Sequence, residues 1–537
     1  MDKLKSISPI IATVLLIIVT VIIVTIILSF GKGFTTTSLD KTKAIKELTV
    51  SDAGVFVYPK SFSDGVLQIN YQPPNNIQEP IIITSYKILE VSDMEPVTLS
   101  TPFTLTNNST NILSLDCLYE YSVENPEMTI ELITSDNTYI TVKQRDIGMV
   151  CSSGGTGTEI DPIIICNAED LNNVRNHLDY NYSLEKDVDL KCFSRLDVNG
   201  WEPIGNTTDK FRGLFNGNNY TISNLYINRP ETNYIGLFGM TDTEINVNDS
   251  QPTKIHMQNI FLKDVNVIGK YYVGGLLGRT YYTDNFEVYN WPFNFFNCNV
   301  TGNVYGLANV GGLIGENYLS DNYKMYGGKI QNSNFNGTAS ATATWSAVGG
   351  LVGRNAGYLL NNYSTGNVTG INRVGGLIGD HGSNLIEKCY SNSSVSGTNN
   401  VGGLVGEQNM DSYDLSKGRI YNCYSLGSVS GTNNVGGLIG LNQVSTVSYS
   451  YSTGSVSGTT NVGGLVGING LDESYEELGT TTNSYYDTTI SGQSDNDGRG
   501  VPKTTTEMKT QSTFTGWNFS TIWNIDPSIN SGYPYLR

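Results

Sequence analysis

The sequence predicts an all-β protein whose larger part is a right-handed parallel β-helix, that is, a solenoid of stacked coils. The first observation is a repeated phrase, Val-Gly-Gly-Leu-x-Gly, with copies that begin at Val273, Val310, Val348, Val374, Val401, Val435 and Val462. The second is the spacing of 26 or 27 residues between copies joined by short connections, which is too short for most paired-helix repeats. The third is an abundance of β-branched residues and glycine, which disfavour helix.

The repeats differ in length mainly at one point. From the apolar start of a repeat to its last glycine the distance is 20 residues in most copies, as in Ile420 to Gly440, and one copy has three extra residues around Trp345. The longer connections follow the last glycine, at 279–294, 316–329 and 407–419. Because insertions at one point of every coil emerge along one edge, the sequence predicts a row of loops on a rigid rod, a usual place for binding.

The recurring residues have structural explanations. The glycine pair permits a positive φ and a close backbone approach at a corner, while the flanking valine and leucine point inward. Cys389 and Cys423 occupy one equivalent position on neighbouring rungs about 4.8 Å apart, which favours buried free thiols over a disulfide or a metal site. A ladder of tyrosines is expected to pack in the same way, at Tyr390, Tyr424 and Tyr451. The short side chains equivalent to the two cysteines are Cys298, Ser333, Asn362 and Ser450.

Composition divides the chain into seven segments. Ile7 to Phe30 is a 24-residue run without charge, long enough to cross a membrane as a helix. A β-rich stretch divided by turn clusters predicts a small antiparallel sandwich. The predicted segments are a leader (1–6), the hydrophobic transmembrane or filament helix (7–34), the sandwich-like stalk or head (35–150), a Gly/Ser/Thr linker (151–160), an N-terminal cap and first coil (161–240), the repeats (241–470) and a C-terminal coil and cap (471–537).

The N-terminal cap is expected to contain an amphipathic helix at 168–178, with Leu171 and Val174 on one face. A solenoid needs such a cap because an open first coil exposes strand edges and apolar core. Cys166 and Cys192 lie in this segment and are a candidate disulfide. Cys117 and Cys151, around the linker, are either paired or free thiols.

The polar leader Met1 to Ser6, followed by Ile-Ser-Pro-Ile-Ile-Ala-Thr-Val-Leu-Leu, resembles the N-terminus of archaeal type IV pilin-like proteins. This resemblance covers about 30 residues and implies cleavage between Ser6 and Ile7, with the helix kept for membrane storage or for assembly with other pilin-like subunits. The sequence lacks the glutamate found near the start of the mature helix in many pilins. The alternative is a plain membrane anchor, and both interpretations place the bulk of the chain outside the cell.

The phrases Val-Gly-Gly-Leu-Val-Gly and Val-Gly-Gly-Leu-Ile-Gly resemble the GLUG motif of bacterial and archaeal surface proteins. The lead-in around Trp201 and 211–222 is similar to that of GLUG arrays, as is the ending Gly-Tyr-Pro-Tyr-Leu at 532–536. The resemblance covers roughly 161–537. It implies a β-solenoid, surface exposure and adhesion.

Charge and composition narrow the choice of partners. The net charge of −18 argues against nucleic acid as a partner, because phosphate binding needs a basic face. Export would make the Asn-x-Ser/Thr sequences candidate glycan acceptors. Those chosen are Asn108, Asn206, Asn299, Asn336, Asn367 and Asn392.

The sequence offers no catalytic or metal-binding constellation. The three histidines, His177, His256 and His381, do not form His-Glu-x-x-His, and His381 is interpreted as a turn residue. Asp380 and Glu407 fall on adjacent rungs just after the repeated phrase, where a solvated edge explains them. We expect no cofactor, with calcium at Asp495-Asn496-Asp497-Gly498 as the alternative to a simple turn.

These observations favour a cell-surface, membrane-anchored or pilus-associated adhesin-like protein that is not an enzyme. Its solenoid would bind cells, carbohydrate or another surface through edge loops. The alternatives are a structural envelope spacer without a ligand and, less favoured, an extracellular polysaccharide-acting enzyme. The candidate contact residues are Tyr281, Tyr282, Tyr318, Tyr323 and Tyr413.

Overall fold

The computed structural model describes strands within 56–143 and, from 154 to 537, all residues except 192–197, 244–254, 283–292, 322–323, 383, 410–417, 471–478 and 498. The chain separates into two compact units, Met1–Val150 and Cys151–Arg537. No helix among the described residues is long and apolar enough to cross a membrane. The predicted helix at 7–34 and its processing site at Ser6 and Ile7 lie outside the described residues.

The first unit contains two antiparallel sheets, as expected for a small sandwich. Ile83, Tyr86, Ile130 and Leu132 are fully buried in the four-stranded sheet. One sheet consists of β1 (Phe56–Ser63), β2 (Val66–Gln72) and β5 (Thr110–Ser114); the other consists of β4 (Val97–Thr104), β3 (Ile82–Ile88), β6 (Thr129–Thr134) and β7 (Tyr139–Lys143).

The second unit begins with the cap. Helix α3 (Ala168–Asn173) ends sooner than predicted, because the chain tightens into the 3₁₀ turn η1 (Val174–Asn176). Asn167 caps the helix by accepting a hydrogen bond from the Asp170 backbone N–H. The short strands of this region are β8 (Ile163–Ile165), β9 (Tyr182–Leu184), β10 (Val188–Asp189), β11 (Phe215–Asn216), β12 (Thr221–Ser223) and β13 (Tyr226–Asn228).

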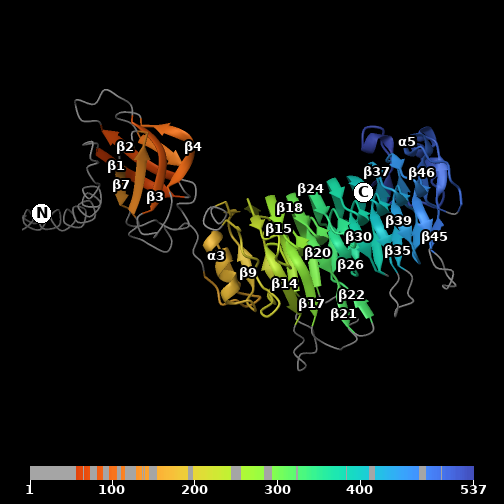
Figure 1. Ribbon diagram of the computed structural model, residues 1–537, viewed down its shortest axis with the longest axis horizontal. Coiled ribbons are helices and arrows are strands. Elements are labelled where there is room, and N and C mark those ends of the chain that lie inside the picture. The colour runs from red at the N-terminus through yellow and green to blue at the C-terminus, as the bar shows by residue number, and fades with distance from the viewer. Residues whose placement is uncertain are drawn as a thin grey trace, which may run out of the picture. The chain divides into compact units, whose positions relative to one another are not determined.

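Three parallel sheets then run along the array, and the stacked strands are seen in Figure 1. The long sheet continues from the cap strands through β15 (Ile255–Ile268), β18 (Phe293–Gly306), β23 (Lys329–Gln331), β24 (Asn334–Ala341), β27 (Leu359–Leu360), β28 (Tyr363–Thr369), β31 (Leu385–Glu387), β32 (Tyr390–Ser396), β35 (Arg419–Tyr421), β36 (Tyr424–Ser425), β37 (Val429–Ser430), β40 (Thr446–Ser448), β41 (Tyr451–Ser452), β42 (Val456–Ser457), β45 (Thr480–Thr482), β46 (Tyr485–Asp487) and β47 (Val501–Lys503).

The repeated phrase supplies the other two sheets. The Val-Gly-Gly sheet consists of β16 (Tyr271–Gly274), β19 (Ala308–Gly311), β25 (Val348–Gly349), β29 (Asn372–Gly375), β33 (Asn399–Gly402), β38 (Asn433–Gly436) and β43 (Thr460–Gly463). The edge sheet consists of β14 (Phe238–Thr243), β17 (Leu277–Tyr282), β20 (Ile314–Asn317), β26 (Val352–Asn355), β30 (Ile378–His381), β34 (Val405–Gln408), β39 (Ile439–Asn442) and β44 (Val466–Asn469). The predicted parallel stacking of coils is confirmed.

Equivalent residues of successive coils lie in register. Val374 pairs with Val401, and Ile386 pairs with Ile420, so each apolar side chain rests on its equivalent in the next coil. These side chains are fully buried in one continuous core. Each coil therefore supplies the cover that its neighbours need, as expected for a solenoid.

The glycine pair acts through close approach and not through a positive φ. A Cβ on Gly376 would lie 2.1 Å from the Gly403 carbonyl oxygen of the next coil, and a Cβ on Gly403 would lie 2.2 Å from the Gly437 oxygen. The positive φ falls instead on the residue before the repeated valine, such as Asn400 (51°) or Asn434 (52°). The predicted positive φ at the glycines is wrong, because the corner is turned by this preceding residue.

The predicted tyrosine ladder is confirmed, and it begins one coil earlier. Tyr363, Tyr390, Tyr424 and Tyr451 stack with ring centroids 4.8 to 5.1 Å apart. The C-terminal segment returns along the array (Figure 1), where Trp523 contacts the rings of Tyr424 and Tyr451. Its elements are α5 (Thr488–Ser491), α6 (Thr505–Met508), η2 (Gln511–Thr513), β48 (Trp523–Asn524), η3 (Asn530–Gly532) and β49 (Tyr535–Leu536).

Candidate functional site

Six strands of the edge sheet (β20, β26, β30, β34, β39 and β44) end at aligned positions, where the side chains are buried except for the half-buried Asn469. The aligned residues are Asn317, Asn355, His381, Gln408, Asn442 and Asn469. Asn317 donates from Nδ2 to Asn355 Oδ1 at 2.7 Å, and Asn442 donates to Asn469 Oδ1 at 3.0 Å. A polar row thus marks the point at which these six strands leave the edge sheet.

The same amides close the base of the connections that follow. Asn317 donates to the Gly328 carbonyl and accepts from the Gly328 N–H, both at 2.8 Å, across the hairpin of β21 (Leu319–Asp321) and β22 (Lys324–Tyr326). Asn442 makes the same two bonds to Ser445, at 3.0 Å each, across only two residues. Both connections are closed by the same pair of hydrogen bonds although they differ in length. The length of a connection can therefore vary while the backbone of the core stays the same.

The tyrosines predicted for the edge have different surroundings. Tyr281 is 37% exposed, with Lys210 Nζ 4.5 Å from its ring centroid. The exposure expected of Tyr318 is wrong, because Tyr318 is buried beneath the Arg354 guanidinium, 4.1 Å from its ring centroid. Tyr282 ends β17, but its side chain lies outside the described residues, as do Tyr323 and Tyr413.

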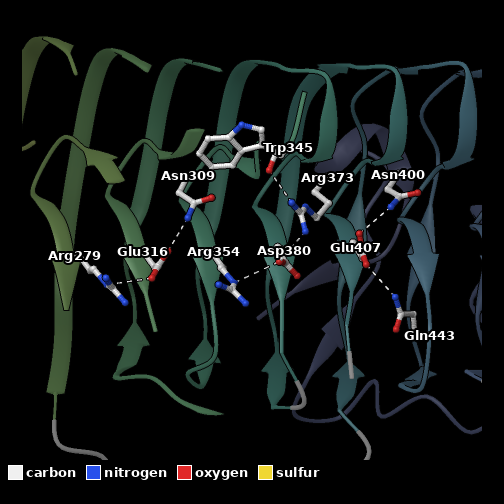
Figure 2. Close-up of polar contacts among 10 residues, drawn as sticks. All are labelled: Arg279, Asn309, Glu316, Trp345, Arg354, Arg373, Asp380, Asn400, Glu407 and Gln443. Atoms are coloured by element: carbon white, nitrogen blue, oxygen red, sulfur yellow. Dashed lines mark hydrogen bonds and ion pairs between the residues drawn. The ribbon is translucent and has the colours of Figure 1, made fainter. Parts of the chain in front are cut away.

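One residue before the polar row, the edge sheet carries a row of charges (Figure 2). Its aligned members are Arg279, Glu316, Arg354, Asp380 and Glu407, followed by Leu441 and Ile468. The solvated edge predicted for Asp380 and Glu407 is wrong, since both residues are buried. Arginine side chains contact Asp380 and amide side chains contact Glu407, which the repeat spacing alone did not reveal.

Two carboxylates of the row, Glu316 and Asp380, are paired with arginines of the neighbouring coils. Arg279 Nε lies 3.1 Å from Glu316 Oε1, and Arg354 Nε lies 3.5 Å from Asp380 Oδ2. Arg373, from the Val-Gly-Gly sheet, adds a second cation 3.7 Å from Asp380 Oδ2. This third guanidinium was not predicted, because it comes from the position before the repeated valine, where most coils have asparagine or tyrosine.

Glu407 has amide partners in place of a guanidinium. Asn400 donates to Glu407 Oε2 at 2.8 Å, and Gln443 donates to Glu407 Oε1 at 2.9 Å (Figure 2). Burial raises the pKa of the Glu407 carboxyl above its ordinary value, and the negative charge of Asp380 raises it further. A polysaccharide-cleaving site would need two carboxylates on adjacent coils, and Asp380 and Glu407 are placed in that way. Both are buried and already hydrogen-bonded or ion-paired, however, which leaves a substrate little access.

His381 is the last residue of β30 and is fully buried, so its prediction as a turn residue is wrong. Its Nδ1 lies 2.9 Å from Asn355 Nδ2. Burial lowers the pKa of His381 to about 4, which leaves the imidazole neutral at neutral pH. Its surroundings are those of the polar row and not of a general base facing solvent.

Trp345 is the most exposed tryptophan described, at 51%. Arg373 Nη2 donates to its carbonyl oxygen at 2.7 Å, and Asn372 binds the adjoining Thr344 carbonyl. Its ring lies 5.2 Å from that of Tyr271, measured between centroids. The backbone is therefore fixed, while the indole is exposed to solvent beside the charged row (Figure 2). The sequence signal for this exposed tryptophan was the three extra residues of its repeat.

The cysteines follow the predicted ladder. Cys298, Cys389 and Cys423 are buried free thiols, which confirms the prediction for the last two. Serines at the equivalent position of the following coil accept hydrogen bonds from the preceding coil: the Cys298 N–H donates to Ser333 Oγ, and the Cys423 N–H donates to Ser450 Oγ. Cys166 is disulfide-bonded, but its candidate partner Cys192 lies outside the described residues, so that pairing stays a prediction.

The candidate glycan acceptors differ in exposure. Asn206, Asn336, Asn367 and Asn392 are exposed, and Asn299 is half-buried. Asn108 lies outside the described residues. Modification of these sites stays a prediction.

The predicted calcium loop is engaged by an arginine. Arg499 Nη2 lies 3.6 Å from Asp495 Oδ2 and 3.4 Å from Asp497 Oδ2. Asp495 Oδ1 also accepts a hydrogen bond from the Gly464 N–H at 3.0 Å, so this carboxylate fastens the segment to the last repeat. Among the described residues, no group of three or more His, Cys, Asp or Glu residues is placed to hold a metal ion.

No family model matches the chain. A protein of Evansella cellulosilytica that carries the name of Gly-rich membrane protein is 43% identical over 104 residues, which are 19% of this chain and 12% of that protein. Halomucin of Haloquadratum walsbyi is 33% identical over 132 residues, which are 24% of this chain and 1% of halomucin. The chain therefore spans only a small part of the length of these relatives.

A crystal structure described as an immunoglobulin A1 protease from Bacteroides ovatus is similar at 20% sequence identity, with a TM-score of 0.39. The match covers 71% of this chain and 94% of the other. A likeness at this level supports no conclusion about activity.

Proposed function

We propose that this chain is a surface-exposed binding protein, membrane-anchored or pilus-associated, in which a rigid GLUG-type solenoid presents the edge connections to cells, carbohydrate or another surface. The observation that carries the proposal is the closure of unequal connections by one structural device, at Asn317–Gly328 and Asn442–Ser445. An edge that accepts insertions without disturbing the core is suited to carrying contact residues.

The names of the two relatives support a surface or membrane setting for this chain. The N-terminal resemblance to pilin-like proteins supports retention by the hydrophobic helix after cleavage at Ser6–Ile7. Export would also allow glycans at the exposed acceptors Asn206, Asn336, Asn367 and Asn392. N-terminal sequencing of the mature protein tests the processing step: a start at Ile7 supports it, and an intact Met1 contradicts it in favour of a plain anchor.

Trp345 and Tyr281 are exposed aromatic residues that could contact a ligand at this surface. The backbone of Trp345 is held by Arg373, so its ring would lose little conformational entropy on binding. Trp345→Ala is expected to weaken attachment at least about tenfold, which corresponds to about 1.4 kcal/mol. Attachment is measured with the purified full chain on cells and on immobilised polysaccharide. An unchanged affinity removes Trp345 from the contact surface.

The edge itself is tested by shortening its described hairpin. Residues 319–327 are replaced by one valine, which retains Tyr318 and leaves the closure between Asn317 and Gly328 the two-residue length found at Asn442–Ser445. The matched control deletes 374–400, one coil with a short connection. This deletion leaves the long connections and the cap intact, retains Asn372 and Arg373 beside Trp345, and places Arg354 beside Glu407. Attachment lost with the hairpin and kept with the coil deletion supports the proposal, and the reverse supports the spacer alternative.

A further inference from the structure

A pocket of about 860 Å³ lies in the cap and first coil. Its walls come from 175–180, 202–209 and 229–235, with Arg212 between them. The volume falls within the range of about 300 to 1,000 Å³ usual for small-molecule sites. All three wall segments belong to the second unit, which holds them within one continuous core.

The polar groups of the pocket are held in place by contacts to the cap. Arg175 Nη2 donates to the Glu202 carbonyl at 2.9 Å, and its guanidinium lies 5.2 Å from the Trp201 ring centroid. Arg212 Nη1 lies 3.3 Å from Asp179 Oδ1. Donors and acceptors fixed in this way before a ligand arrives lose little entropy on binding.

The pocket also contains an aromatic pair. The rings of His177 and Tyr180 are stacked, with centroids 4.7 Å apart and planes 8° apart, and Tyr180 is 39% exposed. The Tyr180 ring lies so close to Gly157 that a Cβ there would be 2.5 Å from Tyr180 Cγ. The glycine thus lets the ring lie flat against the backbone, which fixes the pair at the pocket wall.

The charges of the lining cancel. Arg175, Arg212 and Arg229 are matched by Asp179, Glu202 and Asp209. A strongly anionic ligand would meet three carboxylates, and an apolar ligand would strip water from six charged groups. Alternating donors and acceptors beside an aromatic surface suit a molecule with many hydroxyl groups and apolar C–H faces.

We propose that this pocket binds a neutral oligosaccharide. The sugar hydroxyls pair with the arginines and carboxylates, and a C–H face of the sugar packs on the His177–Tyr180 pair. The buried Asn233 Oδ1, which accepts no hydrogen bond within the described protein, supplies an acceptor in the wall. The hairpin at 319–327 contributes no residue to the lining, so the pocket and that connection can be tested separately.

The ligand has two sources to distinguish. One is a separate oligosaccharide, and the other is a glycan attached to the chain at Asn206, which is exposed and lies on the lining. Full-length protein is therefore compared as the wild type and as Asn206→Gln, with the intact mass of each recorded. A lower mass for the variant by the size of a glycan, together with oligosaccharide binding only in the variant, identifies the attached glycan as the occupant.

The test uses an array of neutral and acidic oligosaccharides, followed by calorimetric titration with the neutral compound that gives the highest signal. His177→Ala removes the exposed ring of the stacked pair, and Ser457→Ala, at an exposed position of β42 in the long sheet, is the control. We expect at least a tenfold loss of affinity for His177→Ala and no change for Ser457→Ala or for the 319–327 replacement. Binding of acidic compounds only, binding unaffected by His177→Ala, or no binding by either the wild type or Asn206→Gln would overturn the pocket proposal. Loss of binding only in the 319–327 replacement would overturn it while supporting the edge.

Discussion

Asp380 and Glu407 are paired in register on neighbouring strands, β30 and β34, with both carboxylates buried. Two guanidinium groups contact Asp380, whereas two amides contact Glu407. Burial raises the pKa of both carboxyls, but Arg354 and Arg373 lower the pKa of Asp380, whereas the charge of Asp380 raises that of Glu407 further. Removing the Asp380 charge therefore leaves two guanidinium groups without their partner, whereas removing the Glu407 charge leaves none. This difference predicts opposite effects for two isosteric substitutions.

Glu407→Gln is expected to stabilise the protein by about 1 kcal/mol at pH 7, because the neutral amide escapes both burial of a charge and repulsion from Asp380. Asp380→Asn is expected to destabilise by a similar amount, since Arg354 and Arg373 lose their shared partner. The measurement is the denaturation midpoint. Because the pKa of Glu407 is raised, the stability gained by Glu407→Gln should vanish at low pH, where the wild-type carboxyl is protonated. A change of stability in the same direction for both variants at pH 7 would contradict this interpretation.

His381 predicts a loss of stability in acid. Its pKa is about 4 in the folded chain and 6.5 ordinarily, so the folded state binds the proton more weakly than the unfolded state. Its contribution is therefore complete above pH 6.5 and is lost as pH falls towards 4, by about 3 kcal/mol. His381→Asn, which installs the residue found at Asn355 and Asn442, should remove this component from urea titrations at pH 7 and pH 4. An identical pH dependence in the variant would show that another group is responsible.

Gly376→Ala tests the close approach of coils. The added Cβ would meet the Gly403 carbonyl oxygen at 2.1 Å, so we expect a loss of about 3 kcal/mol or failure to fold. Gly382→Ala is the control, because its nearest contact is an ordinary 3.6 Å to Ala356 Cβ. Thermal unfolding of both variants gives the comparison, and equal midpoints would mean that the corner is looser than described.

The buried thiols should resist modification until the solenoid unfolds. Burial raises the pKa of Cys298 to about 12 and that of Cys423 well above its ordinary value, so the reactive thiolate is scarce. Alkylation followed by peptide mass spectrometry should label Cys298, Cys389 and Cys423 only in denaturant. Labelling of Cys423 in the native protein at the rate of a model thiol would contradict its position in the ladder.

The sequence predicted the parts of the fold that depend on repetition. Register, inward valines and the Cys389–Cys423 ladder all follow from equivalent positions being stacked. It did not predict what side chains do once they leave the backbone: Arg373 reaches Asp380 from another sheet, and Tyr318 is covered by Arg354. The alternation Arg279, Glu316, Arg354, Asp380 was readable at one repeat position and should have suggested paired charges.

Two asparagines that look alike in the sequence have different roles in the structure. Asn317 and Asn400 are both asparagines beside the repeated phrase, yet Asn317 fixes the base of a connection while Asn400 has a positive φ and binds Glu407. Spacing indicates that both positions matter, but only backbone conformation assigns the role. The pocket in the cap was missed for a similar reason, since its walls come from segments that share no motif.

Attachment by the 319–327 replacement variant is the most direct test of the central claim, that a solenoid of fixed geometry presents a variable edge for binding. Circular dichroism and the unfolding midpoint establish first that the core is unchanged, as the retained closure at Asn317–Gly328 predicts. Attachment to cells or polysaccharide should then fall at least tenfold relative to wild type, while the coil deletion 374–400 attaches normally. Undiminished attachment by a correctly folded variant would contradict the account.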